Sequence, residues 1–201
     1  MMTRRPWVLA AGAGAAVLLA FLLDPWIWLH GELPGIYEKD WGRLLRVMGS
    51  LVVWFPFALA VWLESRATAP ERAGRAWLLL FSPALAGLAA ELLKLVFRRE
   101  RPGLHDGEYV YRAFTDRPFD THDLGLPSSH AAVAFGGAAI VARLFPRAGP
   151  IAYVLAAGCA LSRIMARAHF LSDVTVAAIV GVVVGGFLWY RVERSSRPME
   201  R

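Results

Sequence analysis

The chain has 201 residues, 57% of them hydrophobic, and its mean hydropathy of +0.44 is too high for an ordinary soluble domain. The formal net charge is +6, but the arginines are scattered through short loops and helix ends, which argues against a nucleic-acid-binding protein. A single cysteine, Cys159, excludes an intramolecular disulfide and a cysteine-based metal site. The composition therefore predicts one integral-membrane domain over residues 1–201.

Six apolar runs, each near the length that a helix needs to cross a bilayer core, predict an all-α polytopic protein with six transmembrane helices. The runs lie at about residues 7–23, 44–63, 76–97, 127–145, 150–166 and 171–190. The first run follows Arg4 and Arg5, but it is long and lacks a clear cleavage site, so we expect a retained transmembrane helix. Residues 30–46 predict either a short amphipathic helix at the membrane interface or a plain loop.

The positions of the arginines predict how the protein is oriented in the membrane. If Arg4 and Arg5 are cytoplasmic, alternating spans put further arginines in short inner loops and tails, where the positive-inside bias acts. This predicts a bacterial inner-membrane protein whose long connection between the third and fourth spans, residues 98–126, is periplasmic. Since this polar loop joins two motifs, we expect it to form a lid or rim over a site. Arg98, Arg99 and Arg167 are expected to meet lipid headgroups, and Arg112 either to meet them or to be solvated.

One motif lies between the fifth and sixth runs and contains Arg163, His169 and Asp173. On a helical path, the spacing of four residues puts the carboxylate of Asp173 beside the imidazole of His169, where it can fix the tautomer and stabilise the cation. His169 is therefore a candidate nucleophile or base. Arg163 offers a planar, permanently charged fork suited to the oxygens of a phosphoryl group.

Two further motifs fall at span ends that alternate topology puts on the same membrane face. Lys94 is followed seven residues later by Arg101, and Pro127–His130 precedes the fourth apolar run. Together with Arg163, these side chains supply three positive charges, and the start of a helix at Ser128 supplies N–H groups that attract anions. Glu91, three residues before Lys94, is expected to neutralise that lysine, with substrate binding as the alternative.

Two histidines and a carboxylate could also bind a metal ion. His130, His169 and Asp173 are accompanied by lysine and arginine in all three motifs, however, and these side chains repel a cation and attract an oxyanion. The sequence therefore predicts a site without metal or other cofactor.

The patterns K-x6-RP, PSSH and SR-x5-H-x3-D, in this order, resemble the signature of the type 2 phosphatidic acid phosphatase superfamily. The resemblance covers residues 94–173 closely, with one departure at Ser129, where the family more often has glycine. It implies that His169 attacks phosphorus to form a phosphohistidine, Asp173 holds its imidazole, and His130 protonates the leaving oxygen and later activates water. It also implies a phosphate-binding set, which comprises Lys94, Arg101, Ser128, Ser129 and Arg163.

The resemblance and the apolar runs together predict a membrane phosphatase acting on a lipid phosphate or pyrophosphate. Candidate substrates are phosphatidic acid, phosphatidylglycerol phosphate, undecaprenyl pyrophosphate and a lipid A phosphate. Two alternatives stay open: a phosphotransferase in which a lipid hydroxyl replaces water, and a non-enzymatic lipid-binding or transport protein whose intramembrane charges line a pathway. The expected partners are membrane lipids.

Overall fold

The computed structural model describes residues 6–195, which form helices joined by loops and, apart from two isolated bridges, no β-structure. The longer helices are α1 (Pro6–His30), α2 (Asp40–Val47), α3 (Leu51–Thr68), α4 (Pro70–Ala76), α5 (Leu78–Phe97), α6 (Ser129–Leu144), α7 (Gly149–Met165) and α8 (Leu171–Ser195). Two short 3-10 helices, η1 (Ile36–Glu38) and η2 (Pro102–Leu104), lie in the loops. Arg4 and Arg5, on which the expected orientation rests, lie outside the described residues.

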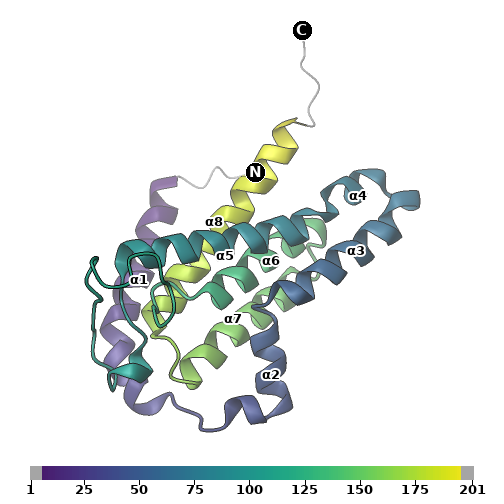
Figure 1. Cartoon of the computed structure of the whole chain (residues 1–201). Helices are drawn as coiled ribbons and strands as arrows, with labels where there is room; N and C mark the ends of the chain where they lie inside the picture. Colours follow the sequence, from purple (N-terminus) through teal and green to yellow (C-terminus); the bar gives the residue numbers. More distant parts are fainter. Residues whose placement is uncertain (1–5, 196–201) are drawn as a thin grey trace.

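Helix α6 forms the centre of the bundle, with α5, α7 and α8 packed against it (Figure 1). Its sequence is rich in alanine and glycine, and small side chains let neighbouring helix backbones approach closely. A Cβ atom at Gly181 of α8 would lie only 2.6 Å from the carbonyl oxygen of Ala132 in α6. Helix α1 packs on α8, and α3 packs on α4 and α5. The small residues of α6 thus explain why this helix lies innermost.

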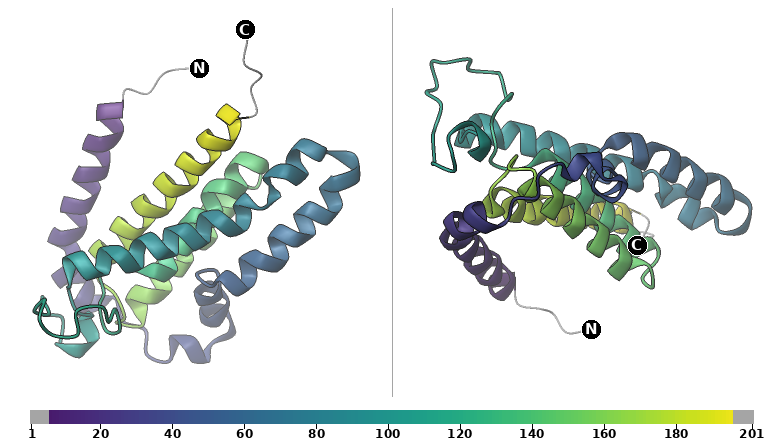
Figure 2. Two further views of the ribbon diagram at one scale, coloured as in Figure 1. Left: turned by 45° about the horizontal axis from the view of Figure 1, so that its top comes forward. Right: turned by 90° about the horizontal axis from the view of Figure 1, so that it is seen from below.

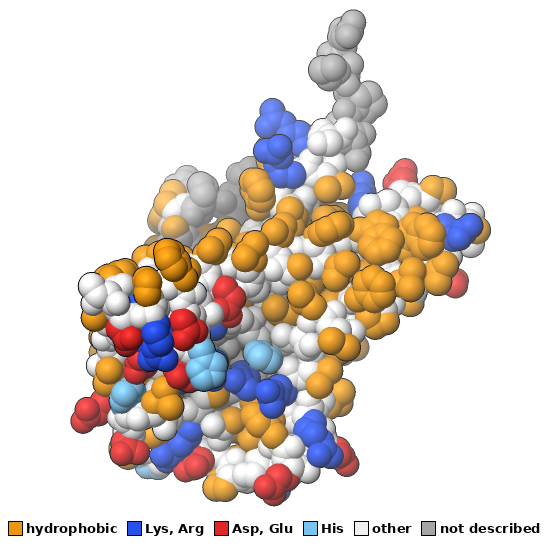
Figure 3. Space-filling view, in the orientation of Figure 1, with side chains coloured by type: hydrophobic (Ala, Val, Ile, Leu, Met, Phe, Trp, Pro, Cys, Tyr) orange, Lys and Arg blue, Asp and Glu red, His pale blue; other side chains and the backbone are white. Residues whose placement is uncertain are grey.

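Within residues 6–195, four helical segments are long and apolar enough to cross a membrane: Trp7–His30, Leu51–Thr68, Pro70–Phe97 and Leu171–Ser195. Helices α6 and α7 are apolar but shorter. Hydrophobic side chains cover much of the face formed by α3, α4 and α5, whereas charged side chains gather near the 98–126 loop (Figure 3). The prediction of an all-α protein is confirmed, and its apolar helices mark it as an integral membrane protein.

The prediction of one apolar helix over residues 44–63 is wrong, because α2 ends at Val47 and α3 begins at Leu51. The Ser50 side chain accepts a hydrogen bond from the backbone N–H of Val52 at 3.4 Å and so begins a new helix. Of the two alternatives for residues 30–46, the structure shows the amphipathic helix, α2, preceded by η1. Helix α1 is also longer than the predicted run and continues past Asp24 to His30.

Candidate active site

The ends of α5 and α7 and the starts of α6 and α8 meet at the end of the bundle where the 98–126 loop and α2 lie (Figures 1 and 2). The predicted site residues are Lys94 in α5, Arg101 in the following loop, Ser128, Ser129 and His130 at the start of α6, Arg163 in α7, His169 before α8, and Asp173 in its first turn. Direct contacts or electrostatic interactions link all eight of them. The structure therefore brings the three sequence motifs together.

His169 and Asp173 face one another across the start of α8. The Nδ1 atom of His169 lies 3.4 Å from Oδ2 of Asp173, and both side chains are buried. His169 lies in the loop between α7 and α8 rather than in a helix, so the helical path assumed from the sequence is wrong, although the two side chains do meet. Because Nδ1 faces the carboxylate, Nε2 is the ring nitrogen left for attack on a substrate.

The electrostatics of His169 suit a nucleophile. Burial, opposed by Asp173 and helped by Arg163 and Arg101, lowers the pKa of His169 to about 4. A lowered pKa favours the neutral imidazole, whose lone pair is the form that a nucleophile needs.

Arg99 forms a buried ion pair with Asp173 that the sequence did not suggest. Its Nη2 atom donates to Oδ1 of Asp173 at 2.6 Å, and neither side chain has any exposed surface. The guanidinium carbon lies 4.9 to 5.0 Å from the ring centroids of Phe21, Tyr109 and Phe170, so aromatic faces surround the cation. The expectation that Arg99 meets lipid headgroups is therefore wrong, and its charge instead balances the carboxylate beside His169.

A second carboxylate, Asp24 of α1, extends this network. Nη2 of Arg99 also donates to the hydroxyl of Ser172 at 2.6 Å, and that hydroxyl donates in turn to Oδ2 of Asp24. Asp24 also accepts from the backbone N–H of Ser172 at 2.9 Å and from the hydroxyl of Tyr109 at 2.8 Å. Helix α1 is thus fixed to the start of α8, one residue from Asp173.

Lys94 is buried and bonded on both sides. Its Nζ atom donates to Oε1 of Glu91 at 2.8 Å and to the hydroxyl of Ser129 at 2.7 Å, and Ser129 also contacts Glu91. The prediction that Glu91 neutralises Lys94 is confirmed. The hydroxyl of Ser129 is thus engaged with this pair, while phosphate binding by Ser129 stays a prediction.

The start of α6 presents further polar groups. Ser128 precedes the helix, its hydroxyl is buried without a hydrogen-bond partner, and its backbone N–H donates to the carbonyl oxygen of Asp173 at 3.2 Å. His130 follows in the first turn of α6, where its interactions with Arg163, His169 and Lys94 place it beside the other motifs. The helix start can therefore offer a hydroxyl and an imidazole to one bound anion.

Arg101 and Arg163 have no carboxylate partner among residues 6–195. The Nε atoms of both are buried without a hydrogen-bond partner. The Nη1 atom of Arg163 donates to the hydroxyl of Tyr37 at 3.0 Å, and that hydroxyl donates to the carbonyl oxygen of Ser162, also at 3.0 Å. Two cations with unused donors thus lie beside His169, an arrangement suited to an oxyanion.

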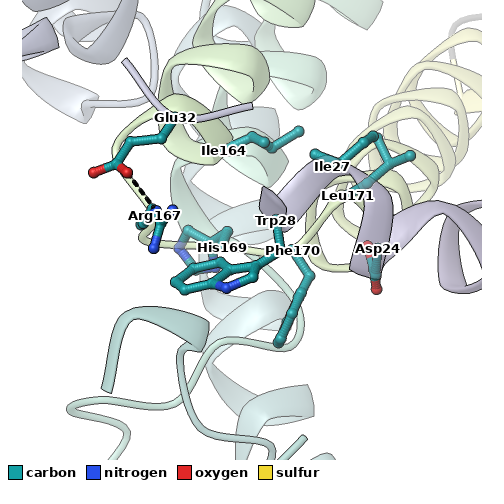
Figure 4. Close-up of a pocket in the computed structure, with 9 residues that line it drawn as sticks. All are labelled: Asp24, Ile27, Trp28, Glu32, Ile164, Arg167, His169, Phe170 and Leu171. Atoms are coloured by element: carbon teal, nitrogen blue, oxygen red, sulfur yellow. Dashed lines mark ion pairs between the residues drawn. The ribbon is translucent and has the colours of Figure 1, made fainter. Parts of the chain in front are cut away.

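A cavity of about 10 Å³ lies on the α1 side of His169 (Figure 4). The indole of Trp28 lies across the cavity. The guanidinium carbon of Arg167 lies 4.0 Å from the centroid of this ring, and Nε of Arg167 lies 2.9 Å from Oε2 of Glu32. A cavity of this size holds about one water molecule, so it cannot accept a phosphate.

The 98–126 loop is held in place by buried arginines. Arg98, only 1% exposed, donates to the carbonyl oxygens of Arg112, Ala113, Asp116 and Pro118. The expectation that Arg98 contacts lipid headgroups is therefore wrong. Arg112 is buried too, so the expectation that it is solvated or meets headgroups is also wrong. Arg112 donates to Glu100 at 2.8 Å, as His105 does at 2.5 Å. Burial would raise the pKa of Glu100, but these two contacts outweigh it and leave that pKa below its ordinary value.

More than half of the chain matches a known protein family. Residues 75–197, which contain all three motifs, match the model of the PAP2 superfamily. The chain belongs to the PAP2 superfamily. The PAP2 motif residues expected to bind phosphate lie in α5 and the loop after it, at the start of α6 and in α7, and the histidine–carboxylate pair spans the start of α8. No solved structure matches the chain.

Two relatives have names that state a phosphatase activity. The lipid A 1-phosphatase of Rhizobium johnstonii is 34% identical over 105 residues, which are 51% of this chain and 42% of the relative. The decaprenylphosphoryl-5-phosphoribose phosphatase of Mycobacterium tuberculosis is 34% identical over 123 residues, which are 61% of this chain and 64% of the relative. The matches thus span less than two thirds of each PAP2 relative.

Proposed function

We propose that this PAP2 protein is a membrane lipid phosphatase that works without a metal ion through a phosphohistidine intermediate. The observation that carries the proposal is the pair of unpaired arginines, Arg101 and Arg163, beside the buried His169–Asp173 pair. The names of the two relatives, both phosphatases of lipid-linked phosphates, support the same reaction class.

The charges of the described residues support phosphate as the ligand. Lys94 is balanced by Glu91, and Arg99 is balanced by Asp173. Arg101 and Arg163 have no such balance, which leaves two positive charges for a phosphate whose negative charge spreads over its equatorial oxygens. The hydroxyl of Ser128 and a proton of Lys94 would add donors, since Ser128 lacks a partner and an ammonium group has three protons.

In the proposed reaction, the lone pair on Nε2 of His169 attacks phosphorus, and Asp173 stabilises the imidazolium that forms at the ring. The bond from phosphorus to the lipid oxygen breaks, and that oxygen takes a proton from His130. Water then attacks the phosphohistidine while His130 accepts a proton from it. This second step releases inorganic phosphate and restores His169.

The membrane arrangement is part of the proposal. We place α6 and α7 across the bilayer with the four longer spans, giving six crossings in one domain of residues 1–201. The 98–126 loop and the site then share the periplasmic face of a bacterial inner membrane. The position of the site at one end of the bundle, next to the amphipathic helix α2, supports access for a headgroup while the lipid chain stays in the membrane (Figure 2).

The two histidines can be separated by what accumulates when each is removed. A substrate with a good leaving group needs little protonation, so His130→Ala should form phosphohistidine quickly and hydrolyse it slowly. His169→Ala should form none. The measurement is acid-labile, base-stable phosphate on the purified protein after brief exposure to a radiolabelled aryl phosphate.

Label on His169→Ala but not on His130→Ala would exchange the two roles. Absence of label from both variants, with an active wild-type protein, would favour direct attack by water. An inactive wild-type protein across a panel of lipid phosphates would reject the phosphatase proposal as a whole.

A further inference from the structure

Arg46, near the end of α2, is a cation that the proposed reaction does not use. Its guanidinium carbon lies 4.9 Å from the ring centroid of Tyr37, and the residue is exposed. Within residues 6–195, no carboxylate forms an ion pair with it. Arg43, three residues earlier on the same helix, differs because it pairs with Asp40 at 2.5 Å.

Tyr37 joins Arg46 to the site. The hydroxyl of Tyr37 accepts a hydrogen bond from Arg163, whose guanidinium carbon lies 5.8 Å from the same ring centroid. One aromatic ring therefore contacts two guanidinium groups, neither of which has a carboxylate partner among the described residues. Two like charges held this close repel one another, and an anion that contacts both would relieve the repulsion.

The end of α2 is also docked against His130. A Cβ atom at Gly49 would lie 2.6 Å from Cβ of His130, so only glycine permits this approach. The thiol of Cys159 lies within 4.0 Å of the carbonyl oxygens of both Arg46 and His130. Arg46 therefore belongs to the segment that packs against His130, and its guanidinium shares the ring of Tyr37 with Arg163. Since the proposed role of His130 is to serve the oxygen that leaves, Arg46 would lie on the leaving-group side of the phosphate.

We propose that Arg46 binds a second phosphate, carried by the leaving group, and that the protein prefers lipid pyrophosphates over lipid monophosphates. The proposal rests on the proposed function. Arg101 and Arg163 would hold the terminal phosphate at His169, and Arg46 would hold the phosphate that is attached to the lipid. A bidentate guanidinium contact suits this group because its oxygens lie in a plane that the planar fork can match.

The reaction balances as a transfer of the terminal phosphoryl group. The lone pair of His169 forms a bond to the terminal phosphorus, and the bond from that phosphorus to the bridging oxygen breaks. The electron pair stays on the bridging oxygen, so the leaving group is a lipid monophosphate whose added charge Arg46 neutralises. Water then releases inorganic phosphate from His169, with His130 taking the proton.

The test compares farnesyl pyrophosphate with farnesyl monophosphate in detergent, using phosphate release by wild type, Arg46→Gln and Arg43→Gln. A lost hydrogen bond to a charged group costs about 1.5 to 3 kcal/mol, so Arg46→Gln should lower kcat/KM for the pyrophosphate by about 10- to 100-fold. For the monophosphate, the change should stay within about threefold. Arg43→Gln is the matched control, because this arginine is also exposed on the same helix but is paired with Asp40. It should hydrolyse both substrates at wild-type rates.

Three outcomes would overturn the proposal. If Arg46→Gln loses kcat/KM equally on both substrates and added anionic lipid restores it, Arg46 is a contact for bulk membrane headgroups. An equal loss that lipid does not restore would give it a structural role through Tyr37, and no loss on either substrate would leave it without a role. By contrast, a wild-type protein that releases no phosphate from either compound would reject the proposed function itself.

Discussion

Replacing Arg99 by methionine tests whether its charge holds Asp173 in place beside His169. The two side chains are joined at 2.6 Å, have no exposed surface and are enclosed by three aromatic rings. Removing one partner of a buried pair leaves an uncompensated charge and costs about 3 to 5 kcal/mol. Arg99→Met should therefore lower the free energy of unfolding by this amount. Phosphate release should fall at least about 100-fold, because Asp173 must either rotate toward another donor or take up a proton.

The assay is thermal and denaturant unfolding in detergent, together with the rate of phosphate release. The double variant Arg99→Met with Asp173→Asn removes the unpaired charge, so it should recover most of the lost stability and stay inactive. Arg98→Met is a neighbouring control, because the Arg98 side chain is also buried but donates its hydrogen bonds to loop carbonyl oxygens and not to Asp173. A single Arg99→Met variant as stable as wild type would refute the reasoning, as would a double variant no more stable than the single one.

Three further predictions concern the same end of the bundle. Gly49→Ala should reduce phosphate release about tenfold or more by pushing α2 away from His130, whereas Gly74→Ala, which meets no atom within 4 Å, should keep full activity. Activity should survive EDTA, and loss on chelation that one divalent ion restores would reject a metal-free site. Because the pKa of His169 is lowered from 6.5 to about 4, its protonation opposes folding. Wild type should thus lose on the order of 3 kcal/mol of stability relative to His169→Asn as the pH falls through this interval, measured by unfolding in detergent.

The site residues that could be predicted from the sequence are polar residues in a recognisable local pattern. Lys94, Arg101, Arg163 and His169 are polar side chains next to apolar runs, and their spacing in three motifs connects them to one family. The predicted alternation of spans puts the end of the third span, the start of the fourth and the link between the fifth and sixth on one membrane face. Their convergence could therefore be predicted from local patterns alone.

Other residues at the site depend on contacts that no local pattern contains. Tyr37 and Arg46 belong to the segment before α3, more than 100 residues from Arg163 in the chain. The positions of Tyr37 and Arg46 depend on the turn at Gly49, which docks α2 against His130. An uninterrupted helix over residues 44–63 would not contain this turn. The apolar run concealed this turn, because hydrophobic content continues across it while the helix does not.

Asp24 shows what kind of signal was present but not used. An acid inside a transmembrane helix is costly unless it has partners, so its presence in an apolar segment is itself evidence of a contact elsewhere. The first predicted span ends at about residue 23, just before Asp24, whereas α1 continues to His30. The hydroxyls of Tyr109 and Ser172 and the Ser172 backbone N–H satisfy the carboxylate, and Ser172 also accepts from Arg99. Because Arg99 binds Asp173, the first helix is coupled through the Asp24 carboxylate to the residue that faces His169. These contacts explain why α1 contains a carboxylate, Asp24, within an apolar helix.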